Sequence, residues 1–193
     1  MNNPEYVKIE DKKYKINTDF RVALECNKIA EDSSISDTER ALAIIYKLFG
    51  DAGLDDYKNH NKLLELGMKF LSLGKEIEKT NEEPDMDFEQ DMDYIETSFI
   101  SDYGKDLSKE KMHWWTFNNL LNGLSDSELG NCCVLNRVRN LRRIDPKTIK
   151  DDKERQKIID AQRKVQLKKN KPILTKEQEE SVMKIYELAG LNK

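Results

Sequence analysis

Two groups of side chains in this sequence have types and spacing that could do chemistry, and the first is a pair of cysteines. Cys132 and Cys133 are adjacent, and His113 is the histidine nearest to them in the sequence. Thiolate and imidazole groups are ligands for zinc. Neighbouring residues of a helix point about 100° apart, so both thiolates cannot easily reach one ion. The sequence therefore predicts no metal site here, but inert and mostly buried thiols.

The second group is a run of alternating acids, which are Asp85, Asp87, Glu89 and Asp91. Such carboxylates could act in acid–base catalysis or bind calcium, but the glycine that an EF-hand loop needs for its turn is missing. We interpret them as the solvated start of a helix, where the helix dipole favours negative charge. A glycine-rich phosphate loop and a G-x-S-x-G motif are also missing from the sequence. We therefore predict that the protein is not an enzyme and binds no cofactor.

The composition favours helices with wide solvated faces. Of 193 residues, 37% are hydrophobic and 36% are charged, and the 8 Gly and 4 Pro are too few for a turn-rich β protein. The net charge of −4 is unevenly distributed: residues 76–96 hold ten acids and one lysine, whereas residues 137–171 hold fourteen Lys or Arg and five acids. We expect these two segments to attract each other. A basic surface for nucleic acid or an acidic partner is the alternative.

Cysteine usage and hydropathy indicate the compartment. Three cysteines without framework spacing are typical of a reducing environment. The first ten residues, MNNPEYVKIE, lack the basic and apolar regions of a signal peptide. The longest apolar run, residues 41–46, is far too short to span a membrane. We expect a protein that does not enter a membrane and stays in the compartment where it is made.

The predicted elements give the fold class: mainly α, a helical bundle with a short N-terminal β-hairpin. Alternation over residues 6–16 predicts the hairpin, which must pack on helices because an isolated hairpin is barely stable. An acidic linker over 75–87 would divide the chain into 1–74 and 88–193, unless the two parts form one continuous domain. Capping residues and apolar spacing predict helices at 19–30 (capped by Thr18 or Asp19), 36–48 (capping box at Ser36, ended by Gly50), 56–73, 87–102 (capped by Asp87), 108–123 (capped by Ser108), 125–141 (capping box at Ser125), from Pro146, 152–169, and 175–189 (capping box at Thr175).

Both tryptophans lie side by side in one predicted helix of high apolar content. Four of its residues, Trp114, Phe117, Leu121 and Leu124, are spaced i, i+3, i+7 and i+10 and so share one face. With Trp115 on an adjacent face, the apolar arc either lies at the centre of a bundle or is partly left for a partner. We expect Trp114 to lie in the core. For Trp115 two assignments remain: the edge of the core, or a surface that contacts a partner.

Several runs of residues together are similar to one known family. They are Val7 to Arg21, Tyr103 to Leu107 (YGKDL), Met112 to Phe117 (MHWWTF), Leu120 to Leu124 (LLNGL), Arg139-Asn140-Leu141 and Ile149-Lys150-Asp151. On these residues, which span most of 5–160, the chain resembles the bacteriophage "gene product fifteen" family, and the H-W-W-x-F core is fairly specific. The adjacent cysteines and the predicted helix after Pro172 depart from the family pattern.

This resemblance implies a protein of a phage tail module, without enzymatic activity, that works in the cytoplasm of the bacterial host. It implies a tail assembly chaperone that binds the tape-measure protein or the tail-tube protein; its oligomeric state is left open. The alternatives are a structural component retained in the tail or head–tail connector, and a helical nucleic-acid-binding protein, which the scarcity of aromatic residues in the basic segment disfavours. We predict that the partner contacts apolar and polar residues of two segments: Met112, Trp115, Asn119, Arg139, Arg142 and Arg143.

Overall fold

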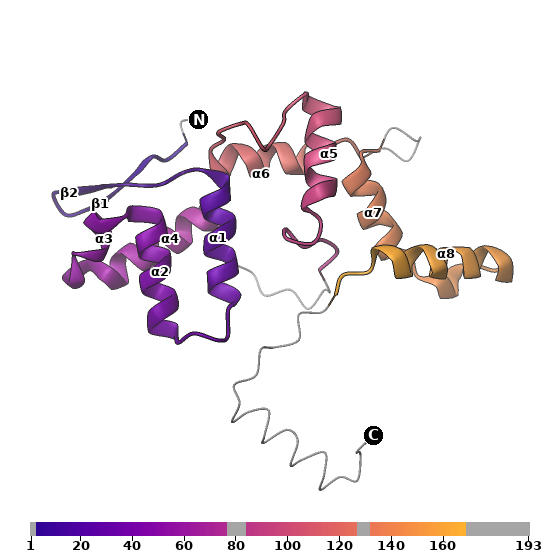
Figure 1. Ribbon diagram of the computed structural model, residues 1–193, viewed down its shortest axis with the longest axis horizontal. Helices are drawn as coiled ribbons and strands as arrows, with labels where there is room; N and C mark the ends of the chain where they lie inside the picture. The colour runs from indigo at the N-terminus through magenta and orange to yellow at the C-terminus, as the bar shows by residue number, and fades with distance from the viewer. Residues whose placement is uncertain (1–2, 77–83, 127–131, 169–193) are drawn as a thin grey trace, which may run out of the picture.

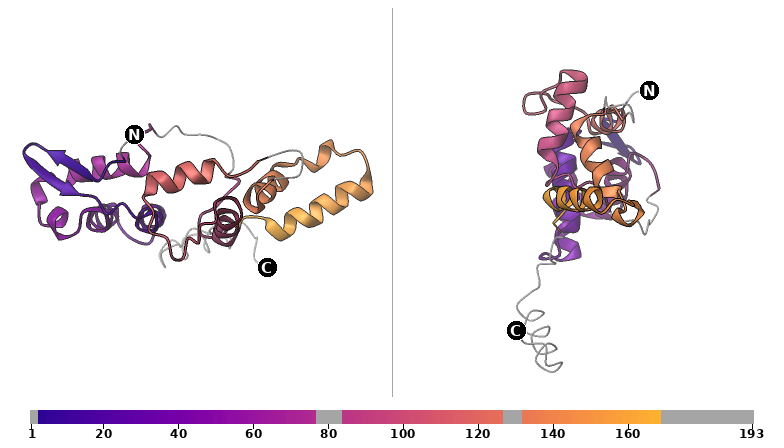
Figure 2. Two further views of the ribbon diagram at one scale, coloured as in Figure 1. Left: turned by 90° about the horizontal axis from the view of Figure 1, so that it is seen from above. Right: turned by 90° about the vertical axis from the view of Figure 1, so that its right-hand side faces the viewer.

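The computed structural model describes residues 3–76, 84–126 and 132–168. The molecule is elongated, with a β-hairpin at one end, the helix pair α7–α8 at the other, and α5 and α6 between them (Figures 1 and 2). This confirms the predicted fold class, mainly α with an N-terminal hairpin. The elements in chain order are β1 (Tyr6–Ile9), β2 (Lys12–Lys15), α1 (Phe20–Glu31), α2 (Asp37–Phe49), α3 (Asp51–Leu54), η1 (Tyr57–Asn59), α4 (His60–Leu71), α5 (Met92–Tyr103), α6 (Trp114–Asn122), α7 (Val134–Arg143), η2 (Pro146–Thr148) and α8 (Asp152–Val165).

The hairpin forms as predicted and packs on the first helices. β1 and β2 are antiparallel, with Val7 opposite Tyr14. The Tyr14 ring is buried and meets the edge of Phe49, with ring centroids 6.4 Å apart. Its hydroxyl donates to Asp56, and Lys12 Nζ lies 2.9 Å from the same carboxylate. These two contacts hold the pKa of Asp56 well below its usual range.

Local capping chemistry sets the ends of α1 and α2 where the sequence predicts them. The Asp19 carboxylate accepts a hydrogen bond from the main-chain N–H of Arg21 at 3.0 Å. Ser36 and Glu39 form a reciprocal capping box at the start of α2. α2 ends at Phe49, and the Gly50 that follows has a φ of +62°, a backbone conformation that glycine adopts at little cost.

The predicted start of the helix over residues 56–73 is wrong. The chain first makes the 3-10 turn η1 and becomes α-helical only at His60. The reason is that Asp56, the expected first residue, turns its carboxylate to the hairpin. The short helix α3 has no counterpart among the predicted helices, because four residues are too few to show a helical period.

The helix predicted from Asp87 also begins later than expected. Asp87 does act as a cap, and its carboxylate accepts from the main-chain N–H groups of Glu89 and Gln90 at 3.0 and 2.7 Å. However, it caps a separate turn, and α5 begins only at Met92. The Asp87 carboxylate therefore stabilises a separate turn in the acidic segment, and the helix that follows is shorter than predicted.

The tryptophan helix, α6, begins at Trp114 and not after Ser108, which corrects the predicted start. Two main-chain hydrogen bonds hold the preceding residues extended against the start of α1. Phe20 N donates to Met112 O at 3.0 Å, and Trp114 N donates to Thr18 O at 2.8 Å. A helix through residues 109–113 would break both bonds, which link positions far apart in the sequence.

The C-terminal helices are only partly as predicted. α7 begins after Cys133, whose sulfur accepts from Asn136 N at 3.4 Å, and not at Ser125. The helical piece at Pro146 and the start of α8 at residue 152 are confirmed. The predicted helix at 175–189 and most of the predicted linker, residues 77–83, lie outside the described residues.

An aromatic core around α6 connects the elements. Phe117 is fully buried and stacks on Phe20 of α1 and Phe99 of α5, with ring centroids 4.6 and 5.3 Å away. The other residues of the predicted inward face are buried as well: Trp114, Leu121 and Leu124. Among the helices that the structure describes, none has the length and apolar character needed to cross a membrane.

Candidate functional site

Both tryptophan side chains are hydrogen-bonded to the end of α4. Trp114 Nε1 donates to Leu71 O at 2.9 Å, and Trp115 Nε1 donates to Phe70 O at 3.0 Å. The carbonyl groups of the last turn of a helix have no N–H partner within the helix, and the two indoles donate hydrogen bonds to two of them. We call the contact of His113, Trp114 and Trp115 with Phe70 and Leu71 the tryptophan junction.

His113 completes the junction through both ring nitrogens. Nδ1 accepts from Trp115 N at 3.0 Å and so caps α6, which places the ring proton on Nε2, 3.0 Å from Pro4 O. Asn3 Nδ2 donates to Thr116 Oγ1 at 2.8 Å. The residues of the H-W-W-T-F run thus contact the N-terminal residues, the start of α1, the end of α4 and α5, so the motif has a structural role.

The three residues near the junction that are predicted to contact a partner differ in exposure. Met112 is buried, with 7% of its surface exposed. Trp115 is half-buried and stacks on Phe70, with ring centroids 6.4 Å apart. Asn119 is exposed. Partner contact by these residues stays a prediction, and the surface that the structure offers for it is Asn119 with the open edge of Trp115.

A second contact joins the acidic and basic segments. We call residues 84–91 the acidic turn. Arg142 of α7 forms a two-pronged ion pair with Asp91, and both N–O distances are 2.7 Å. The Asp91 side chain is 1% exposed and that of Arg142 is 10% exposed. Arg142 also donates to the main-chain oxygens of Asp85 and Val165, at 2.8 and 2.6 Å. We call this contact the Asp91–Arg142 latch; it joins the acidic turn, α7 and the end of α8.

Asp85 of the acidic turn adds two further ion pairs. Arg139 Nε lies 3.2 Å from its carboxylate, and Arg143 contacts the same group. In the described residues, these contacts confirm the expected attraction between the acidic and basic segments. The three arginines that are predicted to contact a partner are therefore engaged within the chain, although Arg143 keeps 58% of its side chain exposed.

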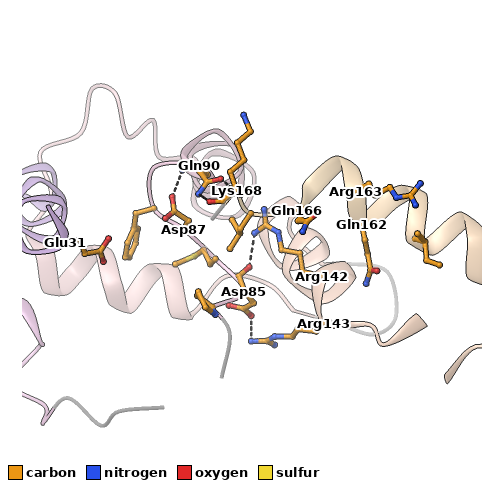
Figure 3. Close-up of a pocket in the computed structure, with 15 residues that line it drawn as sticks. Glu31, Asp85, Asp87, Gln90, Arg142, Arg143, Gln162, Arg163, Gln166 and Lys168 are labelled. Atoms are coloured by element: carbon orange, nitrogen blue, oxygen red, sulfur yellow. Dashed lines mark hydrogen bonds and ion pairs between the residues drawn. The ribbon is translucent and has the colours of Figure 1, made fainter. Parts of the chain in front are cut away.

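A groove of about 1010 Å³ lies between the acidic turn and α8 (Figure 3). One wall is the acidic turn with the end of α7, and the other is α8 with the residues that follow it. Figure 3 shows the Asp87, Gln90 and Lys168 side chains gathered at one part of the groove, with Arg163 farther along α8. The half-buried apolar residues of its lining are Met86, Phe88, Ile159 and Leu167, and the exposed Pro84 lies at its edge.

The groove is fixed to the rest of the molecule at two places. The Phe88 ring lies 6.1 Å from that of Trp114 and 6.4 Å from that of Phe117, which places the groove floor directly on the core. At the rim, Gln90 Oε1 accepts from Lys168 N at 2.7 Å while Gln90 Nε2 donates to Lys168 O at 3.1 Å. The main chain at the end of the described region is therefore held by one amide side chain.

This arrangement suits the binding of a helix. A concave surface with apolar side chains in its floor and charged groups at its rim fits an amphipathic helix that places one apolar stripe inward. The floor combines residues 86–88 with residues 159–167, so no period within one segment could reveal it. The available signals were Phe88 and Ile159, apolar residues in strongly charged segments.

The thiols have no metal-binding arrangement in the described residues. Cys26 and Cys133 are buried and Cys132 is half-buried. Burial raises the pKa of the Cys26 thiol to about 12, which keeps it protonated. Within residues 3–76, 84–126 and 132–168, no three His, Cys, Asp or Glu side chains come together in a way that could hold a metal ion.

Comparison with known proteins gives one finding. A family model described as "Bacteriophage Gp15 protein" matches residues 1–167. Searches of curated proteins and of solved structures gave no significant match. The matched region ends at Leu167, a residue of the groove floor, so that residues 168–193 lie beyond it.

Proposed function

Since this chain belongs to the bacteriophage Gp15 family, we propose that it is a tail assembly chaperone, which binds the tape-measure protein or the tail-tube protein while the tail is built. The observation that carries this proposal is the groove, with its apolar floor of Met86, Phe88, Ile159 and Leu167. In the proposed role the protein acts in the cytoplasm of the bacterial host, and no covalent bond is made or broken.

The groove suits the physical task of such a chaperone. A tape-measure protein is a long helical chain whose apolar stripes aggregate when they are exposed. Burial of a stripe contributes about 25 cal/mol per Å² of apolar surface, and ordering of the bound segment offsets part of this gain. A groove floor of four side chains therefore favours reversible binding, which a chaperone needs in order to release its partner.

Charge on the far end of the molecule supports fast encounter with an acidic partner. We call residues 132–168 the α7–α8 arm; it holds twelve Lys or Arg and five acids. Lys153, Lys157 and Lys164 are exposed on α8. Complementary charge raises association rates more than it raises affinity. We therefore assign recognition to the groove and steering to the arm.

The test is co-expression of the full chain with the tape-measure protein encoded by the same phage or prophage. We expect the full chain to keep the tape-measure protein soluble and to co-purify with it. Ile159→Asp places a charge in the groove floor and should lower the co-purified amount by about tenfold. Ile100→Asp is the matched control, because Ile100 is 53% exposed on α5 and does not line the groove.

Two results would contradict the proposal. If the two variants behave alike, the groove is not the binding surface. If purified phage particles contain the protein in fixed amounts, it is a structural component of the tail or connector and not a chaperone that leaves. The role in nucleic-acid binding is the weaker alternative, because Arg139, Arg142 and Arg143 are paired with acids; it requires DNA affinity that falls steeply with salt.

A further inference from the structure

We propose that the groove has a ligand within the same chain: the C-terminal segment 175–190 docks in the groove, and a partner helix must displace it. The inference rests on the proposed function in one respect, namely that the groove is the helix-binding surface. It adds a regulatory occupant that the shared family region does not contain, since the family match ends at residue 167.

The point at which the chain leaves the groove is the first observation. Leu167 and Lys168 line the groove, and Gln90 holds both the N–H and the C=O of Lys168. The chain therefore starts toward its C-terminus from a fixed position on the rim. Six residues, 169–174, separate this position from the segment, and at about 3.3 Å per residue they reach roughly 20 Å. That reach is enough to turn the chain back over the groove.

The sequence of the segment fits an apolar floor. Residues 175–190 lie outside the described part of the chain, and their sequence predicts a helix that begins with the capping box at Thr175. On that helix, Val182, Ile185, Tyr186 and Ala189 are spaced i, i+3, i+4 and i+7, which makes one apolar stripe. Such a stripe could cover the apolar floor of the groove, which no described residue covers.

Charge favours the same pairing. Near its start, after Thr175 and Lys176, the segment has three acids in four residues, EQEE at 177–180. The groove rim carries Arg163 and Lys168, and the exposed Lys164 lies next to them on the last turn of α8. The α7–α8 arm as a whole has twelve basic and five acidic residues. Opposite charge thus orients the start of the segment toward the end of α8.

A ligand tethered to the groove sets a minimum affinity that a partner helix must exceed in order to bind. A short linker gives the segment an effective concentration in the millimolar range at the groove. A partner helix that binds no better than the segment is therefore excluded at cellular concentrations, whereas a long tape-measure helix with several stripes can compete. Binding of the partner then displaces residues 175–190 from the groove.

The experiment uses full-length chains and a fluorescent synthetic peptide of residues 172–193, with binding followed by anisotropy. In the Ile185→Asp chain the tethered segment can no longer dock, and the peptide should bind at least about 10-fold more tightly than it binds the wild-type chain. Lys184→Gln makes the net charge more negative by the same unit, at least 100° away from every residue of the stripe, and should behave like the wild type. Equal affinity for the wild-type and Ile185→Asp chains overturns the inference.

The site of binding is tested with two groove variants made in the Ile185→Asp chain. Ile159→Asp and Leu167→Asp should each weaken peptide binding by about 10-fold without changing the thermal melting curve. Two positions are used so that the test survives if one of the variants does not fold. Unchanged peptide binding in both overturns the inference. So does a concentration-dependent dimer that Ile185→Asp dissolves, because the occupant would then be the tail of a second copy. A groove that binds the tape-measure protein but ignores this peptide refutes the inference and leaves the proposed function standing.

Discussion

The tryptophan junction and the groove both use large apolar side chains, but they place them differently. At the junction, each indole lies against α4 and donates its N–H to a main-chain oxygen. In the groove, Phe88 and Ile159 are only half-buried and face an open space. The comparison teaches that the densest apolar motif of the sequence builds the scaffold, whereas the surface available for binding comes from sparse apolar residues in charged segments.

Ion pairs show the same contrast within the groove itself. Asp91 and Arg142 are almost fully buried, and their two hydrogen bonds fix the acidic turn on α7. Arg143, which pairs with the neighbouring Asp85, is mostly exposed. Buried pairs are costly to break on one side only, whereas exposed pairs contribute little. The latch therefore defines the shape of the groove, and the exposed arginine remains available to a partner.

The largest effect on stability is expected at the junction. Trp114→Ala should lower the free energy of unfolding by about 4 kcal/mol, because it leaves a cavity beside Phe117 and an unpaired Leu71 carbonyl. Urea denaturation measures this loss. Trp114→Phe, which keeps a ring but removes the N–H donor, should cost about 1.5 kcal/mol. Equal losses for the two variants would show that the hydrogen bond and not the packing dominates the junction.

The next largest effect is expected at the latch. Asp91→Ala leaves Arg142 buried without its carboxylate and should cost about 3 kcal/mol. Arg143→Ala removes an exposed cation and should cost less than about 1 kcal/mol. Hydrogen exchange should locate the damage from Asp91→Ala in the acidic turn and the end of α8. If exchange rises around α6 instead, the groove and the junction are one cooperative unit, and the comparison fails.

A substitution in the groove floor should affect partner binding more than stability. Ile159→Asp should change the unfolding free energy by no more than about 1 kcal/mol, because Ile159 is half-buried in a helix without a fully buried side chain. Its effect on partner binding, about tenfold, should be much larger than its effect on stability. Thermal melting and binding measured on the same sample test this separation. A melting loss as large as that of Trp114→Ala would mean that the floor is part of the core.

The smallest effect concerns acid stability at the approach to the junction. Asp106 accepts from Lys109 Nζ at 2.6 Å and from Ser108, and these contacts lower the pKa of its carboxyl from 3.8 to about 2. A depressed pKa means that the carboxylate stabilises the fold above pH 3.8 and that this contribution is lost as the pH falls toward 2. Melting curves across this window should show a smaller acid-induced decrease for Asp106→Asn than for the wild type. An identical decrease for both would rule out Asp106 as a contributor.

Local signals in the sequence located most of the elements, but they could not reveal the long-range contacts that set several of the element boundaries. The capping box at Ser36 acts within four residues, and it sets the start of α2 where the pattern predicts it. The start of α6 depends instead on bonds between residues 18–20 and 112–114, which no local pattern encodes. The start of α5 was misjudged because Asp87 caps a turn that does not continue into the helix.

For the candidate site, the sequence predicted the kind of interaction and not the geometry. Charge counts predicted that the acidic and basic segments attract each other. They could not show that Asp91, among many acids, would be the buried partner of Arg142. The groove depends on that choice, because the latch brings residues 86–88 opposite residues 159–167. Trp115 was predicted as a contact residue because it lies on a helix face next to the apolar stripe, and the structure gives its indole a hydrogen bond to Phe70 O in the scaffold.

The placement of both indoles at the end of one helix has a practical consequence for spectroscopy. Tryptophan fluorescence of this protein comes from two adjacent indole rings, and it reports the contact between α4 and α6. Emission is therefore nearly silent about α8, about 30 residues farther along the chain, in which no side chain is fully buried. Far-ultraviolet circular dichroism weighs all helices alike, so a comparison of the two optical signals during heating separates melting of the scaffold from fraying of the basic end.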